Sequence, residues 1–283
     1  MPTPKSLYAD ALNEISKRYG HLDHQTVRRL IELLQETRKS IALQLLQGPT
    51  DFETFRLSQL RDNIDIIVKR FQLQFGDDLT KALVEAHGLG VGGVTNPLNA
   101  IGLNVGTFNT IPTAQLNVVL DFSAELIQNI GDDLRKTINT QLRLSTLAQQ
   151  TPFQAMKNVT DALGIKAKDG VWGRRNRPEV VRGVAARAET IVRTEMTRIF
   201  NLAQSSQQQQ AAQTVPELRK RWVATGDGRT RDSHLRAHRR YNRNPIPIDK
   251  PFIVGGAKLM FPGDPRGPAS ETINCRCTTQ MLA

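Results

Sequence analysis

The 283-residue chain has little cysteine and no long apolar run. Its two cysteines, Cys275 and Cys277, are separated by one residue, and so short a loop does not allow relaxed disulfide geometry. We therefore expect a chain made for a reducing cytoplasm or assembled in one. Residues 1–6 contain no apolar core of signal-peptide length, and no apolar run approaches the ~18 residues of a membrane span.

Aromatic residues are also scarce, at 5% of the chain. This scarcity argues against a platform on which the bases of single-stranded nucleic acid would stack. Charge, by contrast, is concentrated. Residues 1–163 carry 16 Lys and Arg against 17 Asp and Glu, a net charge of −1, whereas residues 164–283 carry 22 against 10, a net charge of +12. Such a surplus attracts polyanions, and double-stranded DNA is the simplest of these; a solvated basic face is the alternative.

The first half of the chain has the periodicity of amphipathic helices. Apolar residues recur at helical spacing over residues 6–46, 51–86 and 113–147, and a short helix follows from Pro152 to about residue 163. The glycine-rich run at 88–93 lacks the Gly-Lys-Ser/Thr ending of a phosphate-binding loop. It therefore predicts a flexible hinge between helices.

The second half changes in character at a basic stretch, residues 164–178, which predicts a linker. Residues 179–212 predict a helix, and the Gln-rich end of this segment is either a polar helix end or a loop. After residue 216, short apolar pieces separated by Gly and Pro predict a small antiparallel sheet. The predicted class is α+β, with a mainly helical region over residues 1–163 and a compact α+β domain over residues 179–283.

An ordered series of motifs runs through this last domain. It comprises Arg193-Thr194-Glu195, then Trp222, Asp227-Gly228-Arg229-Thr230-Arg231-Asp232-Ser233-His234, Pro262-Gly263-Asp264-Pro265 and Asn274-Cys275-Arg276-Cys277. Over roughly residues 180–280 the series resembles the phage Mu protein F-like family of minor head proteins.

That resemblance implies a virion protein of a tailed phage, assembled in the host cytoplasm. Such a protein acts in head morphogenesis and in DNA packaging and ejection. The partners it implies are the portal protein, capsid or scaffolding protein, and double-stranded DNA, with no membrane. A capsid-assembly scaffold is a further alternative, and it predicts loss of the chain from mature particles.

Metal binding is one chemistry that the sequence offers. His234 and His238 are four residues apart, as on one helical face, and Cys275 and Cys277 supply two thiolates, which together make a set that zinc accepts. Cys-x-Cys is less usual than Cys-x2-Cys, and relatives in the family often carry Cys-x-x-Cys near residues 232–234, where this chain has none. Buried thiols that pack the end of the domain are the alternative. The sequence requires no cofactor, and a structural zinc is the one candidate.

Catalysis has weaker support. His234, Asp227 and Asp232, with Arg193 and Glu195, are of types that could form a phosphodiester-cleaving or ADP-ribose-transferring site. Each also has a structural role available, and no nucleophile stands beside an evident base. We therefore predict no enzyme, and the alternative is a nuclease-like or ADP-ribosyltransferase-like toxin effector built on the same C-terminal domain. Growth of the expressing cell discriminates between the two.

Basic side chains concentrate over residues 219–243. They are Arg219, Lys220, Arg221, Arg229, Arg231, Arg236, Arg239, Arg240 and Arg243. Arginine binds phosphate through two parallel hydrogen bonds, and phosphate contacts position DNA without reading its sequence. The cluster predicts non-specific DNA binding that weakens steeply with salt. The alternative is a basic surface facing an acidic portal or capsid subunit.

Overall fold

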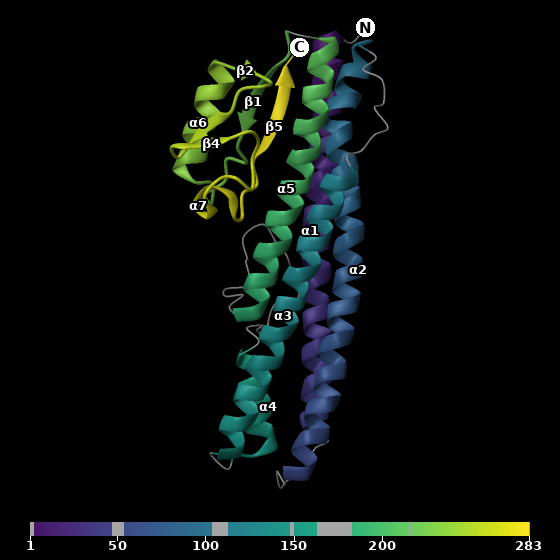
Figure 1. Ribbon diagram of the computed structural model, residues 1–283, viewed down its shortest axis with the longest axis vertical. Coiled ribbons are helices and arrows are strands. Elements are labelled where there is room, and N and C mark those ends of the chain that lie inside the picture. Colours follow the sequence, from purple (N-terminus) through teal and green to yellow (C-terminus); the bar gives the residue numbers. More distant parts are fainter. Residues whose placement is uncertain are drawn as a thin grey trace. The chain divides into compact units, whose positions relative to one another are not determined.

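The computed structural model describes residues 3–46, 54–103, 113–147, 150–162, 183–215 and 217–282. Five helices come first: α1 (Pro4–Leu46), α2 (Thr54–Ala100), α3 (Thr113–Leu147), α4 (Pro152–Ala162) and α5 (Gly183–Thr214). Five short strands and two further helices follow: β1 (Arg219–Val223), α6 (Asp232–Arg243), β2 (Ile246–Pro247), β3 (Phe252–Val254), β4 (Ala257–Leu259), α7 (Ala269–Thr272) and β5 (Thr278–Leu282) (Figure 1). The predicted α+β class is confirmed. Within the described residues, no helix is both long and apolar enough to span a membrane.

The chain divides into two compact units, each built from separate segments. Unit 1 comprises residues 1–26, 80–121 and 192–283, and unit 2 comprises residues 27–79 and 122–191. The predicted linker at 164–178 lies outside the described residues. The domain boundaries proposed from the sequence remain predictions, because both fall within the undescribed stretch from 163 to 182.

Unit 2 is helical, and its core is formed by the apolar stripes that the periodicity predicts. The buried residues include Leu30, Leu33 and Ile41 of α1, Ile64, Val68, Phe71 and Phe75 of α2, and Ile130, Leu134 and Ile138 of α3. Their spacing of three and four residues aligns each set on one helix face. The rings of Phe71 and Phe75 stack with centroids 5.7 Å apart.

The strands of unit 1 form two small antiparallel sheets, in the orders β2-β1-β5 and β3-β4. Gly255 and Gly256 join β3 to β4 with φ of 57° and 85°, a left-handed pair typical of a tight hairpin turn. Trp222 of β1 and Tyr241 of α6 both meet the Phe252 ring edge-on, at 5.4 and 4.9 Å. Cys275 and Cys277 belong to the same buried cluster.

The glycine run at residues 88–93 lies inside α2, so the predicted hinge is wrong. A Cβ at Gly90 would lie 2.3 Å from the Phe200 carbonyl oxygen and 2.8 Å from the Ala203 Cβ on α5. A Cβ at Gly93 would lie 2.5 Å from Nε2 of Gln204. The glycines therefore serve close packing of α2 against α5 in unit 1, an approach that helical periodicity alone does not reveal.

We predict that Gly90→Ala lowers the free energy of unfolding by about 1–3 kcal/mol, because the added methyl group forces the two helices apart. Gly88→Ala is the matched control, since its Cβ would meet no atom within 4 Å. It should raise stability by up to about 1 kcal/mol through helix propensity. Denaturant unfolding followed by circular dichroism measures both changes, and a stabilised Gly90 variant would contradict the packing role.

Candidate functional site

Helix α5 presents a polar face to the C-terminal segment of the chain. Asn201 donates from Nδ2 to the Cys277 carbonyl oxygen (3.0 Å) and accepts at Oδ1 from the Thr279 N–H (3.2 Å). The Thr279 hydroxyl donates to Gln204 (3.2 Å) and accepts from Gln208 (3.3 Å). The Gln-rich stretch is thus helix, and its buried amides hold the strand β5.

The segment 274–277 turns sharply before it enters β5. Asn274 has a φ of 55°, a left-handed conformation that Asn adopts more readily than most residues, and its N–H donates to the Thr194 hydroxyl (3.0 Å). Side chains two residues apart on an extended segment point the same way. Cys275 and Cys277 are accordingly both buried while Arg276 between them is partly exposed, which accounts for the Cys-x-Cys spacing.

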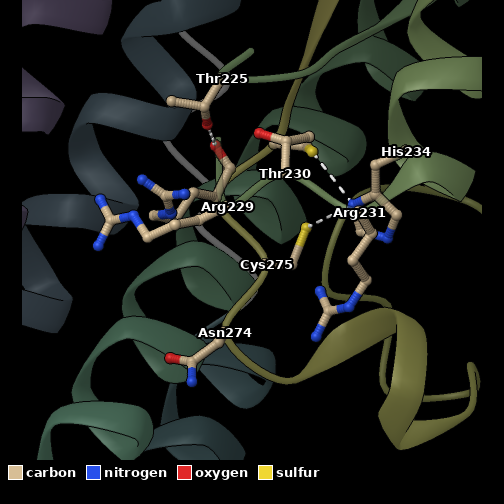
Figure 2. Close-up of a pocket in the computed structure, with 9 residues that line it drawn as sticks. Thr225, Arg229, Thr230, Arg231, His234, Asn274 and Cys275 are labelled. Atoms are coloured by element: carbon tan, nitrogen blue, oxygen red, sulfur yellow. Dashed lines mark hydrogen bonds between the residues drawn. The ribbon is translucent and has the colours of Figure 1, made fainter. Parts of the chain in front are cut away.

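Both sulphur atoms converge on His234, in the first turn of α6. Its Nδ1 lies 3.2 Å from the Cys277 Sγ and 3.7 Å from the Cys275 Sγ (Figure 2). Its Nε2 lies 3.0 Å from Oε2 of Glu271, which also accepts a hydrogen bond from the Ser233 hydroxyl (2.8 Å). One buried imidazole is therefore bracketed by two thiols and a carboxylate.

His238, the fourth residue of the predicted ligand set, lies outside this cluster. It is one turn further along α6, where its Nδ1 is 3.2 Å from the Trp222 carbonyl oxygen and 3.3 Å from the Ala224 nitrogen. Nδ2 of Asn242 lies 3.0 Å from the same Nδ1. His238 is thus engaged by the backbone at the end of β1. Of the four predicted metal ligands, the structure brings together three: His234, Cys275 and Cys277.

The two thiols differ in acidity. A hydrogen bond from Cys275 lowers the pKa of Cys277, and burial opposes this effect. The same hydrogen bond, together with burial, raises the pKa of Cys275. The direction of these shifts favours deprotonation of Cys277 over Cys275, and the thiolate is the form in which cysteine is a nucleophile or metal ligand.

A small pocket opens beside this cluster. It is lined by Thr225, Arg229, Thr230, Arg231, His234, Asn274, Cys275, Arg276 and Cys277 (Figure 2). Next to it, Asp227 accepts two hydrogen bonds from Arg276 (2.6 and 2.7 Å) and one each from the Arg229 N–H and the Thr230 hydroxyl (3.1 and 3.2 Å). The Arg276 hydrogen bonds hold the pKa of Asp227 well below its usual range. The motif at residues 227–234 and the motif at residues 274–277 are thus joined by the ion pair between Asp227 and Arg276.

The Pro262-Gly263-Asp264 motif is structural. Asp264 is buried and accepts from the Met260 N–H (2.8 Å) and from the Arg266 side chain (2.7 Å). Burial alone would raise the pKa of Asp264, but the hydrogen bonds from Arg266 and the backbone lower it overall. Gly263, at a φ of 81°, accepts at its carbonyl from Arg198 of α5, which in turn pairs with Glu195 (2.7 Å).

The residues predicted to contact DNA fall into different environments. Lys220 is buried, and its Nζ donates to the Met260 carbonyl oxygen (2.9 Å) and lies over the Phe252 ring. Lys220 is therefore not available to contact DNA, contrary to the prediction. Arg221 donates to Gln280, Arg219 to the Pro245 carbonyl oxygen, and Arg231 to the Ile273 carbonyl oxygen. The four arginines of α6, which are Arg236, Arg239, Arg240 and Arg243, are exposed.

The sequence interpretation missed several residues of the site. Glu271 contacts His234 and accepts a hydrogen bond from Ser233, and the position of this carboxylate four residues before Cys275 was a signal for it. Asn201 gave no signal, because an Asn inside a helix has no pattern that indicates a distant carbonyl group. These residues hold the predicted ones in position.

We predict that Asp227→Asn lowers the melting temperature at neutral pH, because the variant loses the ion pair with Arg276. A carboxylate whose pKa is lowered by folding contributes stability that is fully present above its unfolded pKa of about 3.9 and is lost as the pH falls through the folded value. The gap between wild type and variant should therefore narrow below about pH 4. Asp10→Asn, which changes an exposed carboxylate of α1, should leave the melting temperature unchanged; a gap independent of pH would contradict the assignment.

Comparison with known proteins gives two matches. A curated protein of Enterococcus faecalis, named NAD(+)--arginine ADP-ribosyltransferase EFV, is 33% identical over 89 residues, which are 31% of this chain and 17% of that protein. The chain thus spans a small part of that relative, and no solved structure matches it. The model of the family described as Phage Mu protein F like protein matches residues 128–280, more than half of the chain. The chain belongs to the phage Mu protein F-like family, whose members are phage head-related proteins.

Proposed function

We propose that this protein is a minor head protein of a tailed phage, carried in the virion near the portal, that acts in head morphogenesis and in DNA packaging and ejection. Unit 1 contacts double-stranded DNA without sequence specificity. Unit 2 docks on the portal or on another head protein. Membership of the family supports the assignment to the head, and the outer face of α6 supports the contact with DNA.

The observation that carries the DNA contact is the division of α6 into two faces. His234, Ala237 and Tyr241 are buried against the rest of unit 1. Arg236, Arg239, Arg240 and Arg243 are exposed and recur at intervals of three and four residues, which aligns them on the opposite face. Among the described residues, no carboxylate forms an ion pair with any of these four arginines.

The spacing of this arginine face suits a duplex. Arg236 and Arg243 are seven residues apart, so the face extends about 10 Å along the helix axis. Duplex DNA carries one negative charge per ~1.7 Å of its axis, and a face of this length can meet several phosphates at once. Arg240 also lies 5.4 Å from the Tyr241 ring centroid, which restrains its guanidinium near the surface.

Unit 2 is better suited to a protein partner than to DNA. Unit 2 carries 19 Lys and Arg against 15 Asp and Glu, a net charge of +4, which is smaller than the +7 of unit 1. Its helices carry large apolar side chains that are more than half exposed, namely Ile66, Leu73, Leu144 and Phe153. A portal subunit or another head protein that covered these side chains would gain about 25 cal/mol per Å² of apolar surface removed from water.

We predict that changing Arg236, Arg239 and Arg240 together to Ala flattens the salt dependence of DNA binding. The slope of log K against log salt should fall by about 0.9 for each phosphate that the variant no longer neutralises, or about 2.7 for three phosphates. Fluorescence anisotropy with a labelled duplex over a range of salt concentrations measures the slope. Lys69, Arg70 and Lys136, which are exposed on unit 2, give a control variant with the same reduction in charge, and that variant should keep the wild-type slope. An unchanged slope in the α6 variant would remove the assignment.

A second candidate is an enzyme or toxin effector built on the C-terminal domain, favoured by the match to the Enterococcus faecalis ADP-ribosyltransferase. Its support is weaker, since that match covers 17% of the relative. Three of the charged residues that such a site would use are engaged in ion pairs: Arg193 with Asp23 at 3.3 Å, Glu195 with Arg198 at 2.7 Å, and Asp227 with Arg276 at 2.6 Å. Transfer of label from NAD to an arginine-containing acceptor, with arrested growth of expressing cells, would put the enzyme first.

A further inference from the structure

We infer that His234, Cys275 and Cys277 form a binding site for one thiophilic divalent metal ion, with Zn²⁺ the best match, and that Glu271 orients the histidine. Imidazole and thiolate are the ligands that zinc prefers in proteins. The site stands on its own geometry and does not depend on the proposed role in the phage head.

The separations of the ligand atoms suit a tetrahedral ion. With Zn–N and Zn–S bonds of about 2.0 and 2.3 Å, two ligands of a tetrahedral zinc lie about 3.5 Å apart for N and S and about 3.8 Å apart for two S. The His234 Nδ1 is 3.2 and 3.7 Å from the two sulphur atoms, and all three ligand atoms lie within 4.8 Å of one another. The two N···S separations match to within a few tenths of an ångström, and the sulphur atoms would approach each other by at most about 1 Å when an ion binds.

The orientation of His234 is fixed by the group on its other side. A carboxylate accepts hydrogen bonds, so the contact at 3.0 Å between Glu271 and Nε2 assigns the ring proton to Nε2. The lone pair of Nδ1 then faces the two sulphur atoms. A carboxylate behind a ligating histidine is the usual arrangement in zinc proteins, and Ser233 holds this carboxylate in turn (2.8 Å).

The cysteine side of the site is equally fixed before any ion binds. Asn274 is tied to Thr194 through its backbone N–H, and the Cys277 carbonyl oxygen is tied to Asn201. Both partners lie on α5, and both sulphur atoms are buried. Ligands that are held in place in this way lose little conformational entropy on binding.

Packing of thiols against the core does not account for the polar groups that surround them. Both thiols lie in an apolar cluster, but a buried imidazole also faces them, and a largely buried carboxylate stands behind that imidazole. Apolar packing alone does not require such polar groups, whose burial is costly. The three protein ligands also leave a fourth position open, on the side of the pocket lined by Thr230, Arg229 and Arg231. Solvent or an anion completes the coordination there.

Cobalt(II) and zinc titrations of the full-length protein test the inference. The chain is purified under reducing conditions, stripped with a chelator and titrated with Co²⁺, which reports thiolate ligation by a charge-transfer absorption band. We expect the band to saturate at one ion per chain and to disappear when Zn²⁺ displaces the cobalt. A folded wild-type chain that takes up neither ion would overturn the inference.

Three variants identify the ligands. Cys277→Ser should abolish the cobalt band, and Glu271→Gln should keep the stoichiometry but weaken affinity by about 10- to 100-fold. His238→Gln is the matched control, since His238 lies on the same helix but outside the cluster, and it should keep both the band and the affinity. If Cys277→Ser does not fold, the Glu271 and His238 variants still decide: equal weakening of both, or of neither, contradicts the site.

Discussion

The buried hydrogen bonds between α5 and the segment 274–279 are the interaction on which the rest of unit 1 depends. Asn201 satisfies a carbonyl oxygen and an N–H of that segment, and each group left unpaired in the core would cost about 1–3 kcal/mol. Because this segment is fixed, β5 pairs along the length of β1, and the two cysteines meet His234. Two motifs of the family, at 193–195 and at 274–277, thus meet along one helix.

Helix α6 connects the site to the surface. Its inner face supplies His234 to the cysteine cluster, and its outer face carries the arginines that we assign to DNA. An ion bound at the cluster would fix the first turn of this helix against the C-terminal segment. The same ion would thereby stabilise the arginine face, so that metal binding in the assembled head would support the DNA contact without taking part in it.

Sequence patterns predicted the helices, their apolar faces and the α+β class, because amphipathic periodicity records which side of an element is buried. They did not predict which elements approach most closely, and the glycines of α2 were therefore misread as a hinge. Lys220 was misassigned to the surface although it stands two residues before Trp222 on a strand, a spacing that puts both side chains on one face. Glu271 and Asn201 act across long separations in sequence, and no local pattern records such interactions.

The central claim is that this chain is a structural part of the phage head. Quantitative mass spectrometry of procapsids and mature particles from the same phage tests it most directly, by counting copies of the chain per portal ring. The account predicts a low copy number that is the same in both kinds of particle. Absence from both would contradict it, and presence in procapsids alone would indicate a scaffold.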